Sequence, residues 1–98
     1  MEDRYAVLYL HSPRENLFGR VFSIGPSGVI FRGIPLDQIE TFKYQFKNDE
    51  PSVFFQTGFY PLHRIERMIE DEAQGPLPSV LDSIVKTSQL SEEAIRQL

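Results

Sequence analysis

The sequence contains no cysteine, and it carries no excess of basic residues. Without cysteine there is neither a disulfide framework nor a thiolate-bound metal, and the composition fits a reducing compartment. No apolar run approaches the roughly 20 residues of a membrane span. Residues 1–4 lack the basic and then apolar pattern of a secretory signal. We therefore expect a cytoplasmic protein with no membrane segment.

Signatures of catalysis and metal binding are missing as well. The two histidines, His11 and His63, stand far apart and in no metal-ligand spacing. Ser12, His63 and Asp37 supply the residue types of a catalytic triad. However, no nucleophile elbow or Gly-rich oxyanion loop surrounds the serines. We predict a non-enzymatic protein with no metal and no cofactor.

The net charge of −4 is unevenly distributed along the chain. Residues 1–68 hold eight basic and eight acidic residues, whereas residues 69–98 hold two basic and six acidic ones, which accounts for the whole −4. Six of the eight cations in the first part are arginine, which suits two-point contacts to phosphate or carboxylate. The absence of a basic excess argues against strong, non-specific nucleic-acid binding.

Alternating apolar patterns and Gly/Pro turns predict five strands, over residues 5–10, 17–24, 29–34, 53–60 and 65–69. Gly19, inside the second strand, indicates a bulge or a sharp bend. Residues 25–28 form a tight hairpin connection between the second and third strands. Residues 61–64, which begin with a proline, are expected to form one 3₁₀ turn.

Three short helices complete the predicted elements. Residues 37–47 have one apolar stripe, and Asp37 followed by Glu40 has the spacing of a capping box. Ser79 is the expected N-cap of a helix over 80–87, and Ser91 that of a helix over 92–97. We therefore expect a barrel domain over 1–70, an acidic Pro/Gly linker over 71–78, and a helical extension of the same domain over 79–98.

The predicted class is mainly β within α+β: a five-stranded SH3-like barrel, with a helix inserted between strands 3 and 4 and a C-terminal helical hairpin. The chain resembles the Sm-like family, which includes the Hfq-type RNA chaperones. Four segments carry this resemblance: Val7-Leu8-Tyr9-Leu10, Leu17-Phe18-Gly19-Arg20-Val21, Gly28-Val29-Ile30-Phe31-Arg32 and Phe59-Tyr60-Pro61-Leu62-His63-Arg64-Ile65.

The resemblance implies a ring-forming homo-oligomer that binds uridine-rich single-stranded RNA. In Hfq-type proteins the last segment carries an aromatic residue and then Lys-His-Ala-Ile, and its lysine and histidine contact RNA. His63 and Ile65 match that motif, the lysine has no counterpart, and Arg64 replaces the alanine. The chain also begins directly in a strand, where the family generally has a helix.

Two groups of residues are candidate binding sites. His63, Arg64 and Arg67 could contact a base and its phosphates. Alternatively, the histidine caps the 3₁₀ turn and the arginines pair with nearby glutamates, Glu66 and Glu70. The second group could bind a phosphate or an acidic peptide, or form a hydrated surface; its members are His11, Ser12, Arg14, Arg20 and Arg32.

The aromatic residues of the fourth strand raise the question of oligomerisation. Phe54 and Phe55 are adjacent, so they face opposite ways, and one of them must leave the barrel core. Either the chain's own helices or a neighbouring subunit covers it. The predicted subunit interface contains Phe55, Phe59, Tyr60 and Ile65. A second hypothesis for function is a protein-interaction adaptor that docks a partner through residues 79–98.

Overall fold

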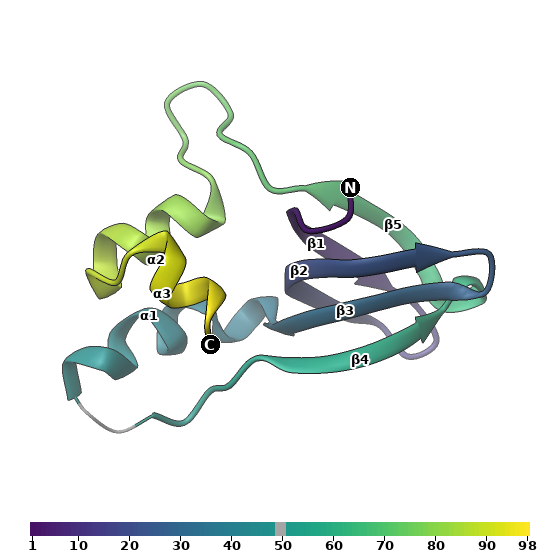
Figure 1. The fold of residues 1–98 in the computed structure, drawn as a ribbon, viewed down its shortest axis with the longest axis horizontal. Helices are drawn as coiled ribbons and strands as arrows, with labels where there is room; N and C mark the ends of the chain where they lie inside the picture. Colours follow the sequence, from purple (N-terminus) through teal and green to yellow (C-terminus); the bar gives the residue numbers. More distant parts are fainter. Residues whose placement is uncertain (49–50) are drawn as a thin grey trace.

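Five antiparallel strands form one sheet, and three α-helices pack at one end of it in this computed structural model, which describes residues 1–48 and 51–98 (Figure 1). The strands are β1 (Tyr5–Leu10), β2 (Glu15–Gly25), β3 (Gly28–Pro35), β4 (Gln56–Pro61) and β5 (Ile65–Glu70). The helical elements are η1 (Leu36–Gln38), α1 (Ile39–Asn48), η2 (Leu62–Arg64), α2 (Val80–Ser88) and α3 (Glu92–Arg96). The α+β class, the five strands, the inserted helix and the two C-terminal helices are confirmed.

The strands lie in the order β4-β3-β2-β1-β5. β4 pairs with β3 and β5 pairs with β1, so the last two strands both join the meander formed by β1, β2 and β3. Within the described residues no ladder joins β4 to β5, so the sheet is open and the predicted closed barrel is not confirmed. The predicted fourth strand also begins too early, because the ladder with β3 starts at Gln56 and not at residue 53.

Strand β2 contains a bulge at Phe22, where the pairing with β3 shifts register between Val21 and Ser23. The sequence predicts a bulge or a sharp bend at Gly19, and the bulge lies three residues later. Gly19 has a different role, because it stands directly opposite Gly33 of β3. A Cβ atom on Gly19 would overlap the carbonyl oxygen of Arg32. A glycine is therefore required at this position by the close approach of the two strands.

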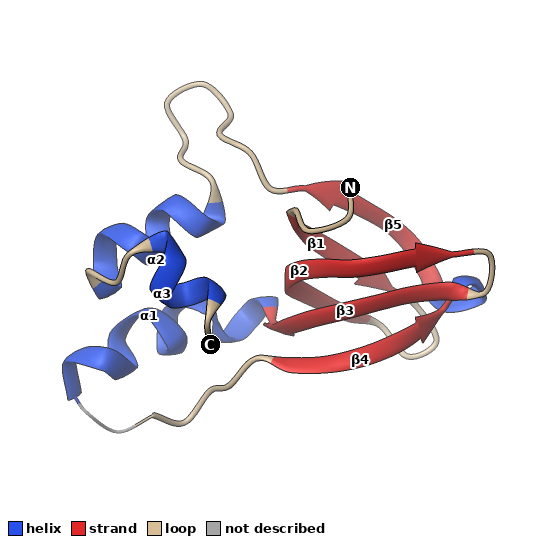
Figure 2. Ribbon diagram, viewed as in Figure 1, coloured by secondary structure: helices blue, strands red, loops and turns tan. Residues whose placement is uncertain are grey.

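The two faces of the sheet bury two separate apolar clusters. The inner cluster receives side chains from all five strands: Ala6, Leu8, Leu10, Leu17, Val21, Val29 and Phe31, with Tyr60, Ile65 and Met68 packed against them. The outer cluster lies between the sheet and the helices: Tyr5, Phe18, Ile34, Ile39, Phe42, Phe55, Leu81, Ile84 and Ile95. Figure 2 shows α1, α2 and α3 gathered at one end of the sheet, with η2, between β4 and β5, at the other.

The helix ends follow local side-chain chemistry in the C-terminal part of the chain. Ser79 Oγ accepts a hydrogen bond from the Asp82 amide, and Ser91 Oγ accepts one from the Ala94 amide, so both predicted N-caps are confirmed. The capping box predicted at Asp37 is wrong. The segment enters a 3₁₀ turn directly after Pro35, and no side chain caps that turn.

Among the described residues, no helix is both long enough and apolar enough to cross a membrane.

Candidate functional site

The turn between β1 and β2 is fastened to η2 by one arginine. The His11 amide donates to the Arg64 carbonyl oxygen at 2.9 Å. In return, Arg64 Nε donates to the His11 carbonyl oxygen at 3.4 Å, and Nη2 donates to the Pro13 carbonyl oxygen at 2.9 Å. The same Nη2 lies 2.9 Å from Glu15 Oε2. A guanidinium group has five N–H donors in a fixed fork, which allows one side chain to join several acceptors.

These contacts change the role that we expected for Arg64. Its side chain is 21% exposed and is directed at the turn, so its main task is to position the turn against η2. Its ionic partner is Glu15, and neither Glu66 nor Glu70 as the sequence suggested. Glu70 instead pairs with Arg4 at 3.2 Å. This pairing could not be predicted from the sequence, because the carboxylate that Arg64 contacts, that of Glu15, lies 49 positions away along the chain.

Three other predicted residues are brought to the same region. His63 and Arg14 are exposed, and among the described residues no hydrogen bond of either side chain is seen. His11 is also exposed, and its Nδ1 lies 3.2 Å from Ser12 Oγ. The turn and η2 therefore present His11, Arg14 and His63 to solvent around the fastened Arg64.

The two remaining predicted arginines lie elsewhere. The guanidinium of Arg67 is 4.4 Å from the ring centre of Tyr9, its neighbour across β1 and β5. Arg32 lies on the outer face of the sheet, where its Nη1 donates to Thr57 Oγ1 at 3.1 Å and its Nη2 donates to the Leu98 carbonyl oxygen. The predicted second group is thus divided, with His11 and Arg14 at the turn and Arg32 on the sheet.

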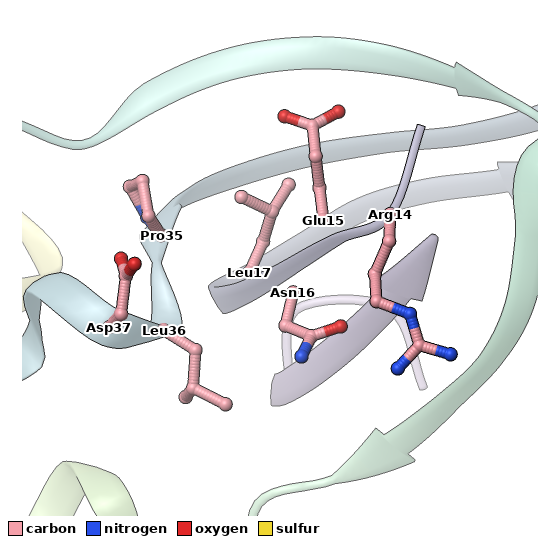
Figure 3. Close-up of a pocket in the computed structure, with 7 residues that line it drawn as sticks. All are labelled: Arg14, Glu15, Asn16, Leu17, Pro35, Leu36 and Asp37. Carbon is pink, nitrogen blue, oxygen red and sulfur yellow. The ribbon is translucent and has the colours of Figure 1, made fainter. Parts of the chain in front are cut away.

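A hollow of about 450 Å³ lies beside Arg14 (Figure 3). Its lining comes from the start of β2 and the junction of β3 with η1: Arg14, Glu15, Asn16, Leu17, Pro35, Leu36 and Asp37. Figure 3 shows Arg14 and Asp37 on opposite sides of this hollow. No pattern in the sequence indicates this hollow. The register that places Leu17 opposite Pro35 brings the two segments together.

Tyr60 connects the inner apolar cluster to this region. Burial raises the pKa of the Tyr60 phenol, the Glu15 carboxylate raises it further, and the Arg64 guanidinium opposes both effects. The pKa of the Tyr60 phenol therefore depends on both members of the Glu15–Arg64 ion pair. Within the described residues, no group of three or more His, Asp or Glu side chains is arranged to hold a metal ion.

The four residues predicted to form a subunit interface have different environments. Phe55 is buried by the chain's own α1, with its ring centre 5.1 Å from that of Phe42. Tyr60 and Ile65 are partly buried against the inner cluster. Phe59 is 56% exposed on the outer face. The chain itself supplies the cover for Phe55, while its neighbour Phe54 is exposed.

Comparison with protein-family models, with curated proteins and with solved structures finds no match to this chain. The assignment of a function therefore depends on the residues and their geometry.

Proposed function

We propose that this chain is a non-enzymatic binding module built on an SH3/Sm-like small barrel, and that it binds single-stranded RNA at the η2 end of the sheet. The strand order and the 3₁₀ turn between β4 and β5 support the barrel class. The inner cluster, to which all five strands contribute, supports it as well. Fold alone does not define a ligand, so the RNA part of the proposal depends on the site.

The observation that carries the proposal is the fastening of the β1–β2 turn to η2 by Arg64. Because the turn and η2 are held together, the backbone positions that carry the exposed side chains of His11, Arg14 and His63 are fixed relative to one another. An imidazole ring can stack on a base or hydrogen-bond to its edge, and a guanidinium binds phosphate. A backbone that is already ordered loses less conformational entropy when a ligand binds.

The distribution of charge supports an anionic ligand at this end. The whole surplus of negative charge belongs to residues 69–98, which include α2 and α3. These helices lie at the end of the sheet away from η2 (Figure 2). Charges separated by more than the Debye length, about 8 Å at physiological salt, are largely screened from one another. A phosphate chain at η2 is therefore little affected by the acidic end.

Assembly into a homo-oligomer belongs to the same proposal. β4 and β5 are the two edge strands of the open sheet, and edge strands can pair with another chain. Light scattering after size-exclusion chromatography tests this part. A closed ring is the expected result, and a monomer at all concentrations contradicts assembly.

The adaptor hypothesis has less support. It requires residues 79–98 to offer an apolar face to a partner, but the large apolar side chains of α2 and α3 face the protein's own core. Leu81, Ile84 and Ile95 are each at most 8% exposed. Removal of this segment would expose the outer cluster to solvent, so the structure assigns α2 and α3 a role in the protein's own core.

Fluorescence anisotropy with a labelled uridine-rich oligonucleotide tests RNA binding. We expect binding that weakens as salt rises from about 50 mM to about 200 mM, because counterions are released from the phosphates. His63→Ala and Arg14→Ala should each weaken binding. Lys86→Ala is the matched control, since it also removes one exposed cation, but from α2. Absence of binding at low salt, or an equal loss with Lys86→Ala, would overturn the proposal.

A further inference from the structure

The outer face of the sheet is divided into a covered half and an uncovered half. Near the helices, Phe18 and Ile34 are fully buried beneath α1, α2 and α3. Toward the β2–β3 hairpin, no helix in the described part of the chain covers the face (Figure 1). Its large side chains are exposed there: Phe22 at 41%, Ile30 at 39% and Phe59 at 56%. Ile30 and Phe59 are direct cross-strand partners, and Phe22 is at the bulge beside them. We call these three residues the apolar triad.

Two arginines lie on the outer face between its covered half and its uncovered half. Arg20 and Arg32 are direct partners on β2 and β3, and like charges in that arrangement repel each other. Arg20 Nη1 lies 2.9 Å from Asp3 Oδ1, and its guanidinium lies 4.9 Å from the Phe22 ring centre. The same carboxylate oxygen also pairs with Arg96 at 3.1 Å, so one aspartate serves two arginines.

Among the described residues, those that alternate onto this face from β2, β3 and β4 carry no carboxylate, and the carboxylate that reaches it is that of Asp3, which precedes β1. On β2, β3 and β4 they include Phe18, Arg20, Phe22, Ser23, Ile30, Arg32, Ile34, Thr57 and Phe59. The face is therefore cationic and aromatic, although the chain as a whole has a charge of −4. Charge complementarity favours an anionic occupant, because Arg20 shares its one carboxylate, Asp3, with Arg96. Among the described residues, the hydrogen-bond partners of Arg32 are the Thr57 hydroxyl and a backbone oxygen of Leu98.

We infer that this face binds single-stranded RNA, with bases stacked on Phe22 and Phe59 and phosphates held by Arg20 and Arg32. The inference rests on the proposed function and extends its binding surface. Exposed aromatic rings on a sheet, with cations beside them, are the usual means of holding unpaired bases. β3 lies between β2 and β4, so the two rings are carried by strands about 9.6 Å apart. That spacing leaves room for separate bases.

The face is continuous with the η2 site. Phe59 belongs to β4, which runs directly into η2, and His63 follows four positions later. The Leu62 amide also donates to the Ser27 carbonyl oxygen at 2.9 Å, which holds η2 against the β2–β3 hairpin. One RNA strand can therefore pass from the apolar triad over the end of β4 to His63.

The test separates stacking from general apolar contact at one exposed position. Phe59→Leu keeps an apolar side chain but removes the aromatic ring, whereas Phe59→Tyr keeps the ring. In the anisotropy assay, we expect the dissociation constant to rise about tenfold for Phe59→Leu. Phe59→Tyr should bind like the unchanged protein. Phe22→Leu should repeat the loss, and denaturant unfolding should show that all three variants remain folded.

The outcomes distinguish this inference from the function on which it rests. If His63→Ala weakens binding and Phe59→Leu does not, the η2 site stands and the sheet-face inference is overturned. If no oligonucleotide binds the unchanged protein, both are overturned. If Phe59→Leu and Phe59→Tyr weaken binding equally, stacking is excluded. A shift in oligomeric state with either variant, seen by light scattering, would identify a second copy as the occupant and also overturn the inference.

Discussion

Arg64 Nη2 lies 2.9 Å from Glu15 Oε2, which joins the 3₁₀ turn η2 to the first residue of β2. The same nitrogen also donates to the Pro13 carbonyl oxygen. The link closes a loop between positions 49 apart, and it holds together the two segments that present the exposed His11, Arg14 and His63. A single side chain thus contributes both to stability and to the shape of the candidate site.

Replacement of Arg64 by alanine should lower the free energy of unfolding by about 1.5–3 kcal/mol, because it removes hydrogen bonds from a largely covered charged group. Glu15→Gln should cost less, about 1 kcal/mol or below, since that carboxylate is 47% exposed. Urea unfolding measures both values. His63→Ala is the control for an exposed neighbour and should change stability by less than about 0.5 kcal/mol. Equal stability of Arg64→Ala and His63→Ala would contradict a fastening role.

Much of the fold was predictable because its signals are local. Strand alternation, Gly/Pro turns and the serine caps each depend on residues a few positions apart. Accordingly, the five strands, the insertion and the caps at Ser79 and Ser91 were predicted correctly. The predicted start of β4 is too early, because Phe54 and Phe55 have the composition of a strand but pair with no strand among the described residues. The ring of Phe55 instead packs against Phe42 of α1.

The candidate site was less predictable, because its geometry depends on contacts between distant segments. The residue types at positions 11, 14, 63 and 64 were recognised from the sequence. The ion pair of Arg64 with Glu15 could not be distinguished from pairs with closer glutamates. The apolar triad was also missed. Which half of a sheet face the helices cover is decided by tertiary packing, and the alternation along each strand carries no information on that point.

The attachment of α2 to the end of β5 should depend on Asp71. Its two carboxylate oxygens accept hydrogen bonds from the Val80 and Leu81 amides, at 2.8 and 2.9 Å. Ser79 Oγ accepts a third amide of the same helix. Asp71→Ala should lower the free energy of unfolding by about 1–2 kcal/mol, as the loss of a helix cap does.

The neighbouring Glu72→Ala is the matched control for Asp71, because it removes an exposed carboxylate from the same linker. It should change stability by less than about 0.5 kcal/mol. A double-mutant cycle with Ser79→Ala measures whether the two caps act independently. Equal effects of Asp71→Ala and Glu72→Ala in denaturant unfolding would show that the double hydrogen bond does not hold the helix.

The close approach of β2 and β3 at Gly19 predicts that alanine substitution has very different effects on stability at Gly19 and at Gly25. Gly19→Ala would place a methyl group against the Arg32 carbonyl oxygen and the Gly33 Cα, both of which are backbone atoms that cannot move aside. We expect a loss of at least about 1–3 kcal/mol, or failure to fold. At Gly25, an added Cβ meets no atom within 4 Å, so Gly25→Ala should remain folded with nearly unchanged stability. Thermal unfolding of the two variants checks the contrast.

Stability at alkaline pH should depend on Tyr5. Burial raises the pKa of its phenol; Arg96 and Arg20 lower it, and Glu92 and Asp3 add to the rise. Since the folded state then keeps the phenol proton at pH values where the unfolded chain loses it, the folded state binds more protons above the ordinary value of 10.0. Stability is therefore unaffected below about pH 10 and falls as the pH rises above it.

One such group contributes a slope of at most about 1.4 kcal/mol per pH unit. Tyr5→Phe removes the titrating hydroxyl and keeps the ring that stacks on Phe18 with centres 5.6 Å apart. The variant should lose less stability than the unchanged protein between about pH 9 and about pH 11. Tyr44→Phe is the matched control, because Tyr44 is 48% exposed. If both variants follow the unchanged protein in urea unfolding across this range, Tyr5 ionisation is not coupled to folding.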